Sequence, residues 1–146
     1  MKIEEAYNKI KKENNSHTNF EELDNFFNIT DVIKQEGFIP KYFERFINKR
    51  IMDHFNSWTS YLHGLVLPNP NSMINMTEHQ MFSDEERNNI MNLLNKIMVI
   101  SSENSLNNLS EKKTDFIDNA TDFWKKNYRP ELEKILKKVN SEWQSK

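Results

Sequence analysis

The stretch PKYFERFINKRIMDHFNSWTSYLHGLV, residues 40–66, decides the fold. Its large apolar residues recur every three or four positions, at Phe43, Ile47, Ile51, Phe55, Trp58, Leu62 and Leu65. Because an α-helix turns once in roughly 3.6 residues, this spacing places them on one helical face. The sequence predicts one long, central amphipathic helix from Pro40 to about Val66, with Trp58 as the most important ring of the core.

The residues before this helix predict shorter helices. Residues 3–12 form either a short docked helix or a frayed arm, so residues 1–16 are a candidate for a loosely docked arm. Thr18 to Glu21 fits a capping box, in which the Thr18 hydroxyl would start the next helix. Thr30 and Asp31 suit a further cap, and Gly37 suits a helix end.

The residues after it predict a connection and two more helical stretches. Residues 67–82 contain two prolines and six large apolar residues, which indicates a long, partly packed connection. Ser83 to Glu86 forms a second capping box, and its helix should continue to about Glu103. The last stretch meets Pro130, which implies a kink or two abutting helices. We therefore expect an all-α fold, a compact bundle of five or six helices in a single domain of residues 1–146.

Composition excludes several classes of function. The chain has 146 residues, a formal net charge of −2, no cysteine and two glycines. Without cysteine there is no disulfide framework and no thiolate metal site. Two glycines cannot build the glycine-rich motifs that cradle nucleotides. No histidine pair has metal-ligand spacing on one helix, so we expect no metal and no cofactor.

The methionine-rich segment at residues 73–81 is the predicted interaction site. Met73, Met76 and Met81 offer adaptable apolar surface, with His79 among them. Thioethers and an imidazole also suit Cu(I), and the alternative is that these methionines fill a gap under the connection. The sequence does not decide between interface and core.

Two groups of basic residues carry the nucleic-acid alternative. Lys41, Arg45 and Lys49 recur every four residues, and Lys125, Lys126 and Arg129 lie among aromatic residues. Such groups can contact phosphates and stack on bases. A solvated helix face accounts for the same pattern.

A third hypothesis concerns Arg50 and His54, which stand one helical turn apart beside Asp53. This pair resembles the Arg-and-His nuclease pair of helical HEPN ribonuclease toxins, although it is spaced more closely than in that family. The resemblance covers these two positions and implies ribonuclease activity with Arg50 and His54 as its catalytic residues. The ordinary interpretation is a polar helix face exposed to solvent.

We expect a small helical interaction protein, an adaptor or accessory subunit without catalytic activity of its own. Its partner would be another protein or a second copy, and nucleic acid is the alternative. No apolar run reaches the roughly 20 residues of a membrane-spanning helix, and no targeting segment is evident, so we expect a cytoplasmic location and no membrane partner.

Overall fold

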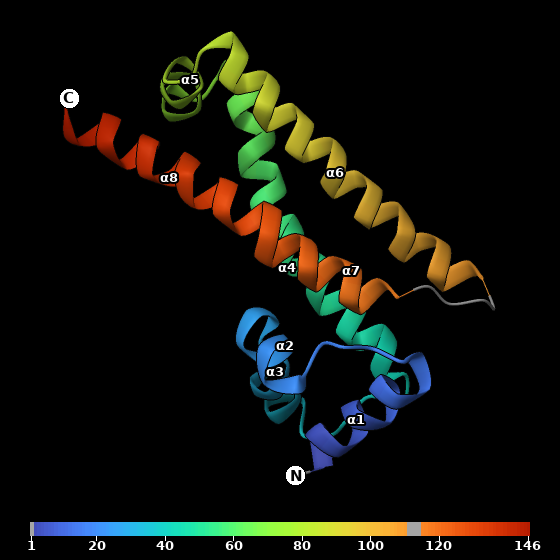
Figure 1. The fold of residues 1–146 in the computed structure, drawn as a ribbon. Helices are drawn as coiled ribbons and strands as arrows, with labels where there is room; N and C mark the ends of the chain where they lie inside the picture. The colour runs from blue at the N-terminus through green and yellow to red at the C-terminus, as the bar shows by residue number, and fades with distance from the viewer. Residues whose placement is uncertain (1, 111–114) are drawn as a thin grey trace. The chain divides into compact units, whose positions relative to one another are not determined.

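The computed structural model describes residues 2–110 and 115–146, and every regular element within them is helical (Figure 1). The prediction of an all-α fold is confirmed. In chain order the elements are α1 (Lys2–Asn14), α2 (Phe20–Phe27), α3 (Ile29–Glu36), α4 (Phe43–Val66), α5 (Met73–Gln80), α6 (Asp84–Leu109), α7 (Phe116–Phe123), a π-helical turn (Trp124–Tyr128) and α8 (Arg129–Gln144). There are more helices than the five or six expected, partly because the connection at 67–82 contains α5.

The chain divides into two compact units, described separately below. Unit 1 comprises Met1–His54 and Ile100–Asp122, and unit 2 comprises Phe55–Val99 and Phe123–Lys146. The long helices α4 and α6 each contribute residues to both units. The single domain expected for residues 1–146 stays a prediction.

Unit 1 has a core built on the first half of α4. Its Ile47 and Ile51 are fully buried, as are Tyr7 of α1 and Leu23 of α2. The Tyr7 hydroxyl donates a hydrogen bond to the Thr18 carbonyl at 2.7 Å, which ties α1 to the start of α2. Burial raises the pKa of Tyr7, so this phenol stays a donor. Whether residues 1–16 detach as an arm stays a prediction.

The cap of α2 differs from the predicted one by one residue. The side chain of Asn19, not Thr18, accepts the hydrogen bond from the Glu22 amide. The Thr18 hydroxyl instead donates to Asp118 at 2.6 Å. A hydrogen bond to a buried carboxylate is stronger than one to a helix amide, and an adjacent asparagine can take over the cap.

The start of α3 also differs from the predicted Thr30–Asp31 cap. The helix begins at Ile29, and both the amide and the hydroxyl of Thr30 donate to the Asp24 carboxylate, at 2.7 and 2.8 Å. Its predicted end is confirmed: Gly37 has φ of +85°, the left-handed conformation that glycine adopts most easily.

The core of unit 2 is a cluster of aromatic rings around Phe55. The Phe55 ring is fully buried and lies 5.2 Å from Tyr128 and 6.0 Å from Trp124. The Tyr128 hydroxyl donates to the Phe55 carbonyl at 2.8 Å, and burial raises the pKa of Tyr128 to about 12. The ring expected to matter most, Trp58, is only half-buried and contacts Tyr61 edge-on.

Pro130 is accommodated by the π-helical turn that precedes α8. In this turn the Arg129 amide bonds to the Trp124 carbonyl, five residues earlier. Proline lacks an amide hydrogen and clashes with the carbonyl of an ordinary helical turn, so a widened turn just before it relieves that clash. The chain remains helical from Phe116 to Gln144 (Figure 1).

The predicted capping box at Ser83 is confirmed. The Ser83 amide donates to the Glu86 carboxylate at 2.9 Å, and the Glu86 amide donates to the Ser83 hydroxyl at 3.2 Å. The helix then runs to Leu109, beyond the expected end near Glu103. Among the described residues, no helix combines the length and apolar character needed to span a bilayer.

Candidate functional site

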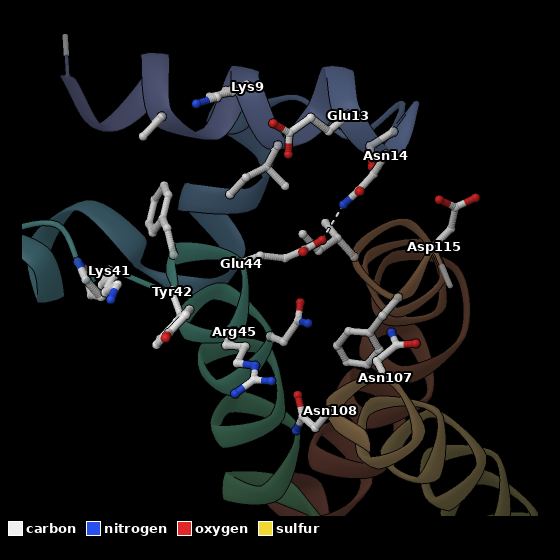
Figure 2. Close-up of a pocket in the computed structure, with 18 of the residues that line it drawn as sticks. Lys9, Glu13, Asn14, Lys41, Tyr42, Glu44, Arg45, Asn107, Asn108 and Asp115 are labelled. Atoms are coloured by element: carbon white, nitrogen blue, oxygen red, sulfur yellow. Dashed lines mark hydrogen bonds between the residues drawn. The ribbon is translucent and has the colours of Figure 1, made fainter. Parts of the chain in front are cut away.

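Unit 1 contains a cavity of about 590 Å³ (Figure 2). Its walls come from α1, the start of α4 and the residues leading into it, the end of α6 and the start of α7. Buried rings of Phe43 and Phe116 line its apolar part. This volume and mixed lining are typical of sites that bind small molecules.

Asparagine side chains supply most of the uncharged polar groups of the cavity. Asn48 of α4 is only 7% exposed, and its Oδ1 has no hydrogen-bond partner among the described residues. Asn107 and Asn108 line the cavity from the last turn of α6, and Asn14 of α1 donates a hydrogen bond to Glu44 (Figure 2). The buried Asn48 acceptor is costly unless a donor reaches it.

Two of the predicted nucleic-acid residues meet at this cavity. The ring of Tyr42 is 64% exposed, with Lys41 Nζ 5.5 Å and Arg45 Cζ 5.6 Å from its centroid. The third residue of that group, Lys49, instead forms an ion pair with Asp53 at 2.8 Å. Because α4 begins at Phe43 and not at Pro40, Lys41 precedes the helix and the three residues do not form one helical stripe.

The second basic group lies in unit 2. Lys125 and Lys126 are exposed on the π-helical turn, and Arg129 bonds to Glu133 at 3.0 Å. The expected groups of three therefore belong to different units. Nucleic-acid binding by these residues stays a prediction.

The predicted interaction segment forms α5, which has no buried residue. Met73 is 83% exposed, whereas Met76, His79 and Met81 are half-buried. His79 Nδ1 donates to the Leu65 carbonyl at 2.6 Å, which fixes α5 against the end of α4. Copper binding by Met73, Met76 and His79 stays a prediction.

The contact between α4 and α5 also explains why position 64 is a glycine. Asn75 of α5 donates to the Gly64 carbonyl at 3.3 Å, and its carboxamide oxygen accepts from the Asn69 amide. A Cβ at position 64 would come within 2.6 Å of Asn75 Nδ2. Glycine is therefore needed here because another helix approaches its backbone closely.

Arg50 and His54 both contact the end of α2. Arg50 Nη2 donates to the Phe27 carbonyl at 3.1 Å, and the His54 ring lies edge-on to Phe27 at 5.5 Å. Burial, and then the charge of Arg50, lower the pKa of His54. The two groups thus hold α2 against α4, and ribonuclease activity stays a prediction.

Sequence reasoning missed the solvent-facing side of α6 in unit 2. We call this side the neutral face, and it consists of exposed residues Asn88, Met91, Asn92, Asn95, Met98 and Val99. At about 100° per residue, these six fall within an arc of roughly 120°. The sequence does contain a signal for this face, namely a scarcity of charge. Lys96 is the one charged residue from 88 to 99, and its position lies outside that arc.

No family model, no curated protein and no solved structure matches this chain. A functional assignment therefore depends on the geometry of its own residues.

Proposed function

We propose that this chain is a helical interaction protein without catalytic activity of its own, which binds another protein through the neutral face of α6. The observation that carries this proposal is the absence of charge from an exposed helix face. Charged residues make up 29% of the chain. Exposed faces of soluble helices usually carry charged residues, so an exposed face without charge that includes methionine and valine favours a second packing partner.

The exposed side chains of the neutral face suit a protein partner. Met91, Met98 and Val99 are 39%, 47% and 56% exposed, and three asparagines lie among them. Flexible thioethers adapt to the shape of a partner, while carboxamides can form hydrogen bonds at the edge of the contact. The face carries no cation, so it cannot neutralise the charge of a phosphate backbone.

Complementary chemistry defines the partner as a helix with an uncharged, partly apolar face. A second copy of this chain has such a face in its own α6. Two neutral faces can meet without repulsion between like charges, which a symmetric contact would otherwise bring together. Self-association through α6 is therefore the form of the interaction that we propose.

The end of α4 and the start of α5 add a second exposed apolar group to unit 2. Leu67, Met73 and Ile74 are 68%, 83% and 64% exposed. Burial of such side chains in a complex would be favourable. We include this group, with the predicted Met76, His79 and Met81, as a second contact of the interaction protein. A single-domain bundle and a cytoplasmic location remain part of the proposal.

The test places negative charge on the neutral face. The variant carrying Asn95→Glu and Met98→Glu should sediment as a monomer at concentrations where the unchanged protein is a dimer, because the contact would bury unpaired carboxylates. Both positions are exposed, so the midpoint of thermal unfolding of the monomer should stay the same. Asn140→Glu is the control, because it adds the same group to an exposed position of α8.

Three results would overturn the α6 assignment. The unchanged protein would be a monomer at every concentration, the double variant would dimerise normally, or Asn140→Glu would weaken the dimer equally. If nucleic acid removable by nuclease accompanies protein purified from its own cells, and Lys125, Lys126 and Arg129 are needed for it, the nucleic-acid alternative replaces the proposal.

A further inference from the structure

We infer that two copies of α6 pair in parallel and in register, along a face that extends the neutral face from Val99 to Leu109. This pairing rests on the proposed self-association through α6, and it adds the direction and the length of the contact. Three features of α6 carry it: the spacing of its exposed uncharged residues, two exposed leucines near its end, and the unequal distribution of carboxamides and leucines along the face.

The uncharged side of α6 continues beyond Val99. Ser102, Leu106 and Leu109 are exposed. At about 100° per residue, they fall within the same arc of roughly 120° as the neutral face. All these residues belong to one continuous helix (Figure 1). Lys96 and Glu103 are the only charged residues from 88 to 109, and both lie outside the arc. The face without charge therefore extends over roughly six turns of helix.

The positions on this face repeat every seven residues. One series consists of Asn88, Asn95, Ser102 and Leu109, and a second consists of Asn92, Val99 and Leu106. Together the two series alternate at intervals of four and three residues, the spacing with which two helices pack side by side over several turns. Lys96 and Glu103 are also seven residues apart, so their charges lie along one border of the face. This spacing favours a long contact between helices over a single crossing point.

Two leucines make the end of this face its most apolar part. Leu106 is 62% exposed and Leu109 is 88% exposed. Removing leucine side chains from water is favourable, so these two positions gain most from a contact. The three asparagines of the neutral face all precede Val99. The face therefore changes along α6 from carboxamides to aliphatic side chains.

This change along the helix determines the direction of pairing. In a parallel pair in register, each residue at the centre of the contact meets the same residue of the second copy. Leu106 then packs on Leu106, and the Asn95 carboxamide can donate to and accept from its counterpart. An antiparallel pair of the same length would place the leucines of one copy against the asparagines of the other. Those carboxamides would lose water without gaining partners.

The charges beside the face do not reverse this preference. An antiparallel pair could bring Lys96 of one copy near Glu103 of the other. An ion pair at the edge of a contact contributes little, whereas burial of leucine contributes more. In a parallel pair, the two copies of Lys96 lie on opposite sides of the contact and do not repel each other at close range.

Single cysteines test the direction, because the chain has none of its own. Asn95→Cys and Leu106→Cys, made as separate variants, should each form a dimer linked by a disulfide when treated with oxidised glutathione. A disulfide requires Cα atoms within about 7 Å. Each variant should link at least about tenfold faster than the control Asn140→Cys on exposed α8, because the dimer holds the thiols at a high effective concentration.

The two variants together identify a parallel pair. In an antiparallel pair, a residue meets its own counterpart only at the centre of the contact. Asn95 and Leu106 are three turns of helix apart, so both cannot occupy that centre. A self-link from one variant alone would overturn the parallel arrangement. A link that forms only when Asn92→Cys is mixed with Leu106→Cys would also overturn it.

The length of the contact has a separate test. Leu106→Gln should raise the dissociation constant of the dimer at least about tenfold, because a leucine is lost from both copies. Lys96→Gln, outside the arc, is the control and should leave the dissociation constant unchanged. Both positions are exposed, so the unfolding midpoint of the monomer should stay the same. An unchanged dissociation constant for Leu106→Gln would show that the contact ends before Leu106.

Failure of this arrangement is distinguishable from failure of the proposed function. A dimer that is lost in the variant with Asn95→Glu and Met98→Glu, but that lacks the two self-links, would keep the α6 contact and overturn its parallel direction. A chain that sediments as a monomer at every concentration would overturn both.

Discussion

Different interactions stabilise the interior of each of the two compact units. In unit 1, a buried carboxylate, Asp118, accepts three hydrogen bonds from Thr18 and His17 across about a hundred residues of sequence. In unit 2, the Phe55 ring packs against Trp124 and Tyr128. A charge network depends on pH and on the identity of one oxygen, whereas a ring cluster depends on volume. The two units should therefore fail under different changes.

Truncation of the ring at the centre of unit 2 should have the largest effect. Phe55→Ala should lower the free energy of unfolding by about 3–5 kcal/mol, because it leaves a cavity beside two other rings. Trp58→Ala should cost less, since Trp58 is half-buried. Chemical denaturation of both variants measures the difference. An equal or larger loss from Trp58→Ala would show that the ring predicted from the sequence dominates the core after all.

The matching change in unit 1 is Asp118→Asn, which keeps the volume and removes the charge. We expect a loss of about 2–3 kcal/mol at neutral pH, because the new amide group cannot accept from every donor that faces Asp118. Glu133→Gln, at an exposed carboxylate of an ion pair, is the control and should change stability by less than about 0.5 kcal/mol. An unchanged unfolding free energy for Asp118→Asn would mean that this network does not stabilise unit 1.

Acid should weaken the Asp118 network. Burial by itself would raise the pKa of Asp118, but the hydrogen bonds from Thr18 and His17 outweigh burial and lower it. A lowered pKa means that the unfolded chain binds the proton more tightly, so the contribution is complete above about pH 4 and is lost as the pH falls further. Unfolding monitored between neutral pH and pH 2 should show a loss that Asp118→Asn reduces. Identical acid profiles for both proteins would contradict this assignment.

The smallest expected effect tests the contact of α4 with α5 in unit 2. Gly64→Ala would stabilise an open helix, but a Cβ here would meet Asn75 Nδ2 at 2.6 Å. We expect a net loss of about 1 kcal/mol. In the background of Asn75→Ala the same change should become neutral or stabilising, and a double-mutant cycle measures this reversal. Equal effects in both backgrounds would remove the close approach as the reason for glycine.

Much of the local structure could be read from short patterns. The three- and four-residue spacing of α4, the reciprocal cap at Ser83 and the glycine end at Gly37 depend on residues within a few turns of one another. The cap of α2 was misassigned because two adjacent residues could each serve, and a distant carboxylate selected between them. The same reasoning could place Arg45 on an exposed basic face, but not beside Asn48 at a cavity.

Sequence alone therefore determined the helical class, most helix positions and the polar or apolar character of each face, because these follow from spacing within one helix. Tertiary structure decided which helix faces are buried and which are exposed, that Thr18 binds Asp118, and that residues of α1, α4, α6 and α7 line one cavity. Such contacts join residues far apart in the chain, and they form only when helices pack. Local periodicity constrains the direction in which a side chain points, but it does not identify what the side chain meets.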